Sequence, residues 1–236
     1  MVVGRRGGKG RIAALVATYL ACYRDWTHLL APGQRAVIPV VAQDLKNAGQ
    51  MMDYLSGLFD NVPALTPLVE RRLSDQIDLW NRVSIKVYAG SFKSLRGPLV
   101  VSALLDEIAF WKSASADVSD TMVVEALRPA MATVSDALLL AMSSPWGKAG
   151  ALWETFDTHY GKEPPPLEPG KPPAKLFLVW QSPTLQMHPE DDTLAGEIAY
   201  EYSTDPVGAS AQYGGLFRND VQAFVSPEII AACTVK

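Results

Sequence analysis

The chain of 236 residues contains few of the residue types that build metal clusters or disulfide frameworks. Its two cysteines, Cys22 and Cys233, lie far apart and match neither a zinc-binding spacing nor a disulfide pattern. Its three histidines, His28, His159 and His188, are scattered and form no ligand cluster. We therefore expect reduced thiols and ordinary histidines.

Long apolar runs are also missing, and no stretch is long enough to span a membrane. The first acidic residue is Asp25, so the N-terminal basic patch Arg5, Arg6, Lys9 and Arg11 has no acidic neighbour in sequence. These cations before the apolar stretch Ile12–Cys22 leave a secretory signal peptide as an alternative. The glycines among the cations have no purpose in such a peptide.

The overall composition is that of a globular protein, with 48% apolar and 19% charged residues. The length allows one sizeable core with a small appendage. A net charge of −4 excludes a uniformly basic nucleic-acid coat, so any contact with DNA must come from local basic patches.

Short apolar runs alternate with helical patterns along the chain. The runs that resemble buried strands are Ala36–Val41, Val83–Tyr88, Leu99–Leu105, Ala137–Met142 and Leu176–Trp180. Helical spacing recurs over Ile12–Leu20, over Ala48–Phe59 and from Asp120, an expected N-cap, to Met131. This alternation predicts an α/β fold with a mostly parallel sheet that is flanked by helices on both faces.

Prolines interrupt the alternation in Gly161–Lys175, which predicts a stiff, exposed linker or insertion. We therefore expect a core domain over residues 1–160, a proline-rich segment over 161–175, and a last core strand with a short helical C-terminal extension over 176–236. Within that extension, Asp205-Pro206 marks the start of a helix.

A glycine-rich loop, Gly4-Arg5-Arg6-Gly7-Gly8-Lys9, separates the short apolar segment Met1–Val3 from the first helical pattern. Glycines let backbone N–H groups surround a phosphate, and the following helix N-terminus favours anions. Lys9 would reach the β- and γ-phosphates. The loop departs from G-x-x-x-x-G-K-[ST] at both ends, since Val3 replaces the first glycine and Gly10 replaces the hydroxyl residue. A basic surface turn is the alternative.

The strand pattern Leu99–Leu105 ends in two adjacent acids, Asp106 and Glu107. At the carboxyl end of a strand, the first carboxylate can hold Mg²⁺ and the second can orient and deprotonate a water molecule. The alternative is a helix N-cap followed by an acid that the helix dipole stabilises.

Two further segments are candidates for contacts with phosphate. Ser143 and Ser144 follow the strand pattern Ala137–Met142, and their hydroxyls could sense a γ-phosphate, although a simple turn explains them too. Lys93 and Arg96 lie just before the strand that ends in the acidic pair. One interpretation is that they contact the phosphates of a nucleic acid, and the alternative is a solvated loop.

With these parts in order, nearly the whole chain resembles the large terminase subunit of tailed bacteriophages, the motor that packages double-stranded DNA. Gly4–Lys9 resembles that family's deviant phosphate loop, and Ser91–Gly97 with Leu104–Trp111 resembles the segment around its acidic pair. Similar pieces follow in the same order: Ala126–Ala130, Ser143–Gly147, Ala211–Arg218 and Ala223–Val225.

The resemblance implies a P-loop NTPase-type fold, with ATP and Mg²⁺ as ligands and double-stranded DNA as substrate. By this resemblance Glu107 activates water, Arg5 stabilises the transferring phosphoryl group, and Asp106 holds Mg²⁺. The implied nucleotide-binding residues are Gly4, Arg6, Gly7, Gly8, Lys9 and Gly10, with Ser143 and Ser144 coupling hydrolysis to movement. The implied partners are a portal protein and a small terminase subunit, with the chain in a homo-oligomeric ring on the portal in the host bacterial cytoplasm.

Three departures from the family pattern are apparent. Gly10 removes a Mg²⁺ ligand, which predicts slow or absent turnover. Only three residues precede Gly4, fewer than the ~5 of a typical strand, so we expect a truncated N-terminus. The acidic constellation of the family's nuclease domain does not appear before Lys236, so we expect no DNA cleavage. The remaining alternatives are another P-loop DNA translocase and a terminase remnant that binds nucleotide or partners without turnover.

Overall fold

The computed structural model describes residues 1–89, 97–111, 119–163 and 177–220. The chain divides into two compact units. Unit 1 contains Met1 and Gly8–Ser143, and unit 2 contains Val2–Gly7 and the chain from Ser144 onward. The candidate DNA-binding residues Lys93 and Arg96 lie outside the described residues, as do Cys233 and the segment Ala223–Val225.

Unit 1 contains a sheet in the order β3-β4-β5-β2-β7-β8, with β6 also paired to β2. Strands β5, β2, β6, β7 and β8 run parallel, and β3 and β4 are antiparallel additions at one edge. Their bounds are β2 Ala36–Ala42, β3 Val69–Arg72, β4 Gln76–Leu79, β5 Val83–Ala89, β6 Leu99–Val100, β7 Ser102–Asp106 and β8 Leu138–Met142. The predicted mostly parallel sheet is confirmed.

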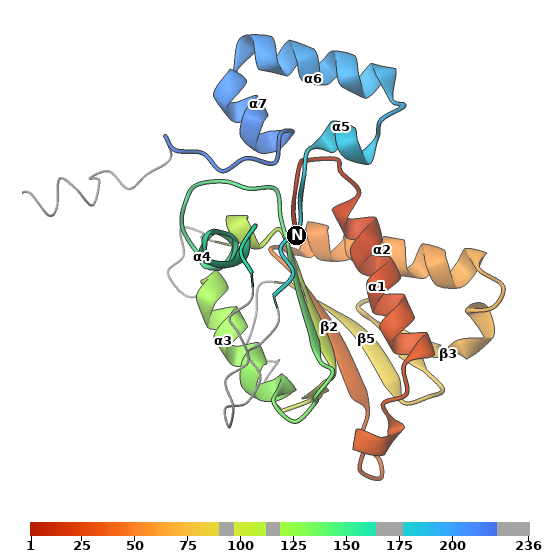
Figure 1. Cartoon of the computed structure of the whole chain (residues 1–236). Coiled ribbons are helices and arrows are strands. Elements are labelled where there is room, and N and C mark those ends of the chain that lie inside the picture. Colours follow the sequence, from red (N-terminus) through yellow and green to blue (C-terminus); the bar gives the residue numbers. More distant parts are fainter. Residues whose placement is uncertain (90–96, 112–118, 164–176, 221–236) are drawn as a thin grey trace, which may run out of the picture. The chain divides into compact units, whose positions relative to one another are not determined.

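Helices flank this sheet on both faces, as predicted (Figure 1). Helices α1 (Lys9–Tyr23) and α2 (Leu45–Asn61) pack against each other and against β5, whereas α3 (Asp120–Met131) lies on the other side. Short 3₁₀ turns cover Thr27–Leu29, Thr66–Leu68 and Ile108–Phe110.

The helical spacing predicted over Ala48–Phe59 is confirmed in α2. Its buried residues are Ala48, Met51, Met52, Leu55 and Phe59, and the Asp44 side chain caps it by accepting from the Asn47 N–H. For α3 the observed cap is Ser119 rather than Asp120, because the Ser119 hydroxyl accepts from the Met122 N–H.

The predicted strand Leu99–Leu105 is divided into β6 and β7 at Val101. Its pairing with β2 slips by one residue between Val37↔Val100 and Val40↔Leu104. The slip lies beside Pro39, which has no N–H to donate to a neighbouring strand. On its other side β7 pairs with β8 without interruption, from Ser102↔Leu138 to Asp106↔Met142.

The antiparallel edge surrounds a buried carboxylate. Asp78 on β4 is 1% exposed and accepts hydrogen bonds from Ser84, Gln76 and Arg71 at 2.6 Å each. Burial raises the pKa of Asp78, but these hydrogen bonds and the charge of Arg35 outweigh burial, so the pKa lies below its ordinary value. The sequence patterns did not indicate this edge hairpin, because β3 is mostly exposed and charged.

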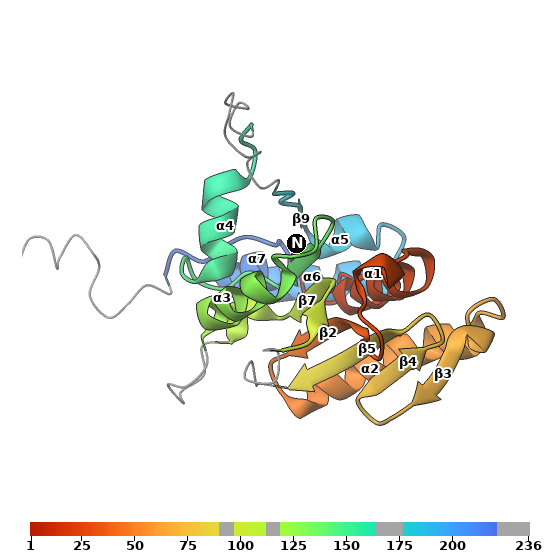
Figure 2. The same ribbon diagram turned by 90° about the horizontal axis from the view of Figure 1, so that it is seen from below.

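Unit 2 combines a small parallel pair of strands with helices. β1 (Val2–Val3) pairs with β9 (Gln181–Ser182), so the predicted strand Leu176–Trp180 is wrong by position: Phe177–Trp180 belongs to no strand, and the strand begins at Gln181. The helices are α4 Ala151–His159, α5 Thr184–Met187, α6 Asp192–Thr204 and α7 Pro206–Gln212 (Figure 2).

The predicted helix start at Asp205-Pro206 is confirmed, since Asp205 accepts from the Gly208 N–H and Pro206 is the first residue of α7. Among the described helices, none combines the length and hydropathy required of a membrane span.

Candidate active site

The acidic pair lies at the carboxyl end of β7 in unit 1. Asp106 is the last residue of the strand, and Glu107 has left-handed backbone angles (φ 51°, ψ 41°), which turn the chain sharply out of the sheet. The Trp111 indole donates to the Asp106 carbonyl at 2.9 Å and fixes the segment after the turn. Residues with such angles carry backbone strain and often occur at functional sites.

Lys9 reaches this turn from the first position of α1. Its Nζ lies 3.5 Å from Glu107 Oε1, and the Lys9 side chain is only 6% exposed. The second carboxylate oxygen, Glu107 Oε2, accepts a hydrogen bond from the Ser143 hydroxyl at 2.9 Å. Unit 1 therefore brings together Lys9, Glu107 and Ser143, which come from three separate parts of the sequence.

The Ser143 hydroxyl is a fixed part of this arrangement. It is fully buried, and it also accepts from the Ala109 N–H at 3.3 Å. The main chain of Met1 also holds this segment. The N-terminal amino group donates to Ala141 O at 2.7 Å, and the Ser143 N–H donates to Met1 O at 3.1 Å. Ser144 is buried as well, but it belongs to unit 2.

The Asp106 carboxyl is harder to ionise than a free one. Burial, followed by the negative charge of Glu107, raises its pKa to about 6, although Lys9 acts in the opposite direction. A cation near Asp106 would offset both causes. Among the described residues, no group of three or more His, Cys, Asp or Glu side chains is placed to hold a metal ion.

The start of α1 is suited to an anion. Gly8, at φ 77°, precedes the helix, and no side chain caps the helix N-terminus. The first turn has no acidic residue, and the first N–H groups of any helix lack partners within the helix. Such an N-terminus is a general phosphate-binding arrangement.

The Tyr54 ring fills the space beside Gly10. A Cβ at Gly10 would lie 2.9 Å from Tyr54 Cε2 and 3.3 Å from Met51 Sδ, so even alanine requires a shift. Tyr54 was not identified from the sequence. It lies three residues after Met51 in the apolar pattern of α2, and that spacing is the one signal that places it on the side that faces α1.

The first half of the glycine-rich loop belongs to unit 2. There Gly4 N donates to Ser182 O at 3.1 Å, Arg5 N donates to Gln212 O, and Gly7 N donates to Gly4 O at 3.1 Å. The Arg5 side chain donates to Gln212 Oε1 at 3.2 Å.

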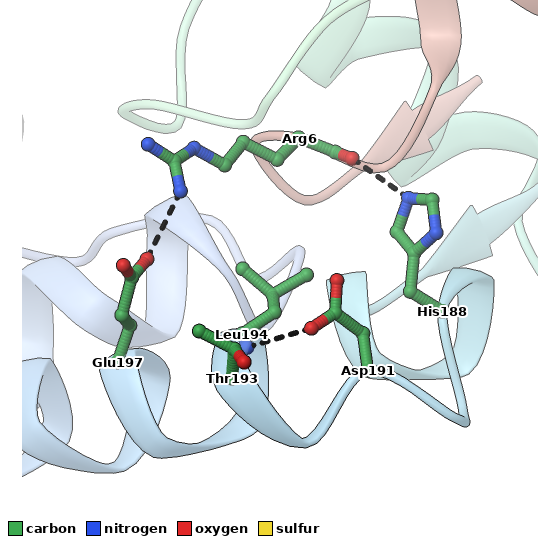
Figure 3. A pocket seen from close by; sticks show the side chains of 6 residues that line it. All are labelled: Arg6, His188, Asp191, Thr193, Leu194 and Glu197. Carbon is green, nitrogen blue, oxygen red and sulfur yellow. Dashed lines mark hydrogen bonds and ion pairs between the residues drawn. The ribbon is translucent and has the colours of Figure 1, made fainter.

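Arg6 has a positive φ of 62° and forms an ion pair with Glu197 at 3.0 Å (Figure 3). The same view shows the pocket in unit 2 that Arg6 lines with His188, Asp191, Thr193, Leu194 and Glu197. The partners of Arg5 and Arg6 lie between 179 and 207 positions away in the sequence, and no local spacing indicated them.

Comparisons of sequence identify no relative, since no protein-family model and no curated protein matches the chain. Comparisons of structure find solved proteins with a similar fold. The ATPase domain of the large terminase of Thermus phage P74-26 matches 90% of the chain over 85% of its own length, with a TM-score of 0.65 at 17% identity. An arginine-to-alanine variant of that domain gives a TM-score of 0.64 at 16% identity over 91% of this chain and 86% of its own.

A longer protein also matches. The large terminase of a thermophilic bacteriophage, in complex with ADP, aligns with 91% of this chain over 47% of its own length, with a TM-score of 0.52 and 13% identity. The chain has the fold of the ATPase domain of a phage large terminase.

Proposed function

We propose that the chain is the ATPase region of a phage terminase large subunit, which couples ATP hydrolysis to translocation of double-stranded DNA into a prohead. The contact of 3.5 Å between Lys9 and Glu107 carries the ATPase part of this proposal, because it joins the phosphate-loop lysine to the acid after β7. The shared fold supports it, as does the ADP in the similar large terminase.

In this proposal the loop Gly4–Gly10 binds the phosphates. The N-terminus of α1 supplies N–H groups and a favourable dipole, and Lys9 supplies a positive charge. Because Lys9 pairs with Glu107 in the structure described here, phosphate would draw its ammonium group away from the carboxylate. Nucleotide binding would thereby release one oxygen of Glu107.

Glu107 is the proposed general base. Ser143 holds Glu107 Oε2 at 2.9 Å and so orients the carboxylate, which would accept a proton from water once Lys9 moves to phosphate. Arg5 would stabilise charge on the transferring phosphoryl group, and to do so its side chain would leave Gln212. Ser144, which follows Ser143, is proposed to link this site to movement along DNA.

The acidic pair would offer Mg²⁺ the oxygen ligands that it prefers, since Asp106 ends β7 directly before Glu107, and a cation would offset the burial and the neighbouring negative charge that raise the pKa of Asp106 to about 6. When bound, the ion would neutralise charge on the phosphates. Asp106 would hold it, directly or through water. Gly10 contributes no hydroxyl, and Tyr54 occupies the space where a side chain at position 10 would begin.

This crowding of Gly10 favours a second candidate, a terminase-like module that binds nucleotide with little turnover. The two candidates share the phosphate site and differ in hydrolysis. Calorimetry with ATP and Mg²⁺, combined with a phosphate-release assay on the same preparation, separates them: binding without release supports the second candidate.

We also propose that Lys93 and Arg96 contact the phosphates of duplex DNA. The proposed partners are a portal protein, a small terminase subunit and further copies of this chain in a ring. A double Lys93→Ala, Arg96→Ala variant should bind duplex DNA more weakly and with a shallower salt dependence. Strand separation by the isolated chain would instead indicate another type of P-loop translocase.

The decisive test is ATP hydrolysis by the purified chain, compared with Glu107→Gln and with Glu125→Gln. Glu125 is an exposed residue of α3, so its variant controls for the loss of one carboxylate elsewhere. Loss of a general base lowers the rate by roughly 100-fold or more. An unchanged rate in Glu107→Gln would show that the assignment of Glu107 is wrong.

A further inference from the structure

The strained point of the glycine-rich loop is Arg6. Because Gly7 N donates to Gly4 O at 3.1 Å, Gly4–Gly7 forms a β-turn with Arg6 at its third position. Its φ of 62° is the positive value that type II turns require there, a position that glycine normally occupies. A residue with a side chain adopts this conformation only when surrounding contacts hold it there.

Two side chains of unit 2 hold the carbonyl groups on either side of this strained residue. The Thr184 hydroxyl donates to Arg5 O at 2.7 Å, and His188 Nε2 lies 2.9 Å from Arg6 O (Figure 3 shows the histidine contact). A carbonyl oxygen only accepts, so His188 Nε2 is the donor in this hydrogen bond. The Arg6 side chain adds its ion pair with Glu197.

The two donors are themselves firmly placed. Thr184 is fully buried, and its N–H donates to Tyr213 O at 2.8 Å. His188 follows one helical turn later, and its N–H donates to Thr184 O at 3.1 Å. A Cβ at Gly4 would collide with the Thr184 hydroxyl and with Tyr213 O, so the loop lies directly against this support.

The orientation of the Arg5 carbonyl group also sets the direction of the next N–H group, that of Arg6. In a planar trans peptide the C=O of one residue and the N–H of the next point in opposite directions. With the Arg5 carbonyl turned toward Thr184, the Arg6 N–H therefore points away from Thr184. Release of that carbonyl would allow the Arg5–Arg6 peptide to flip, since a flip of the central peptide relates the type II and type I turns.

We propose that Thr184 and His188 are positioning residues of the phosphate loop: they hold the Arg5–Arg6 peptide so that the Arg6 N–H faces the phosphates of a bound nucleotide. This inference rests on the proposed function, because it assigns the loop a nucleotide ligand. It adds two residues that lie about 180 positions from the loop and that the proposed chemistry does not use.

The test is calorimetry of the full chain with ADP and Mg²⁺, together with KM and kcat for ATP. Thr184→Val removes the donor and keeps the shape, and it should weaken ADP binding and raise the KM for ATP by about tenfold, as expected for an unsatisfied buried carbonyl. The kcat should change less than the KM. Thr184→Ser restores the donor and should bind ADP like the wild-type chain, and Thr204→Val, at the exposed end of α6, is the control.

A second measurement separates positioning from general stability. Glycine adopts a positive φ without support, so Thr184→Val should cost much less affinity when Arg6→Gly is already present. At the half-buried His188, His188→Gln keeps a donor at a similar reach, whereas His188→Leu removes it, so only the leucine variant should weaken binding.

The outcomes distinguish the two proposals. Absence of ADP binding by the wild-type chain would overturn the proposed function and this inference together. Normal binding by the wild-type chain with equal binding by Thr184→Val and His188→Leu would overturn only the inference. An identical loss from Thr184→Val in the presence and absence of Arg6→Gly would also overturn it.

Discussion

Lys9 and Glu107 share a close ion pair, with 3.5 Å between Nζ and Oε1, although 98 positions separate them in sequence. The lysine side chain is 6% exposed and the glutamate side chain is 28% exposed, so water screens this pair only in part. In this state the cation and the carboxylate neutralise each other. A phosphate group would compete with Glu107 for the same ammonium.

The first prediction concerns that ammonium. Lys9→Met keeps most of the apolar stem and removes the charge, so affinity for ADP should fall at least about tenfold, the loss expected for a charge-assisted contact. Isothermal calorimetry measures it. Lys46→Met, at an exposed position of α2, is the matched control and should bind ADP normally. Equal affinities for the two variants would contradict a phosphate role for Lys9.

The second prediction concerns the space beside Gly10. Gly10→Ser should destabilise the chain by about 1 kcal/mol, the low end of the cost of overpacking, because its Cβ would lie 2.9 Å from Cε2 at the outer edge of the half-buried Tyr54 ring, which must move. Urea denaturation measures this free energy. Gly49→Ser is the matched control on α2, since a Cβ there meets no atom within 4 Å.

Tyr54→Ala should relieve the penalty of Gly10→Ser. The double variant also offers a hydroxyl at position 10, so its Mg²⁺-dependent ATP hydrolysis should exceed that of Tyr54→Ala alone. Equal rates would indicate that a hydroxyl at position 10 has no function in this chain.

The third prediction follows from Asp106, whose pKa rises from 3.8 to about 6 on folding. For an acid with a raised pKa, the stabilising contribution is complete below the unfolded value and is lost as the pH rises through the folded value. Asp106→Asn stays neutral, whereas the wild-type chain loses stability as Asp106 ionises. The free energy of unfolding of the variant should therefore be close to that of the wild-type chain near pH 4 and exceed it by about 3 kcal/mol at pH 8. Thermal denaturation without nucleotide or metal measures this difference.

The exposed Asp53 provides the control for the third prediction. Asp53→Asn should show a stability difference that changes little over the same pH range. If Asp106→Asn behaves like Asp53→Asn, the Asp106 carboxyl is not destabilised by its surroundings.

The fourth prediction concerns Asp78, whose pKa lies below its ordinary value. Its stabilising contribution is present above the unfolded pKa and is lost as the pH falls through the folded pKa. At pH 7, Asp78→Asn should therefore cost about 1–3 kcal/mol, the loss expected when the buried acceptor of several hydrogen bonds is changed, because its partner Arg71 is itself 60% exposed. This cost should shrink under strongly acidic conditions.

Asp60→Asn is the comparison for Asp78. Asp60 pairs with Arg72 at 2.6 Å, but its side chain is 56% exposed, so its loss should cost less than about 1 kcal/mol. Urea denaturation at pH 7 distinguishes the two variants. Similar costs would indicate that burial contributes little to the Asp78 network.

Local periodicity predicted the helices, but in α1 it did not predict the buried side, since Leu15 and Tyr19 of the apolar pattern are exposed. The apolar positions of α2 and the strand that ends at Asp106 were predicted because burial repeats along one element. The sheet class followed from the alternation of such elements. The β3–β4 hairpin was missed, since Val69–Arg72 is an exposed edge with charged residues and lacks an apolar signal.

The contacts that complete the site could not be predicted in this way. The distance from Thr184 to Arg5, or from Tyr54 to Gly10, depends on how separate elements pack, and residue spacing carries no record of it. The interruption at Val101 was missed for a related reason. The register slip occurs opposite Pro39, on a neighbouring strand more than 60 positions away, and the spacing of residues 99–105 holds no trace of that neighbour.

The contact between the Tyr54 ring and Gly10 also has an evolutionary consequence. Two positions that occupy one volume cannot vary independently, because a larger residue at one requires a smaller residue at the other. Relatives of this chain that carry serine or threonine at position 10 should therefore carry a residue smaller than tyrosine at position 54. Relatives that retain glycine at position 10 should retain a bulky residue at position 54.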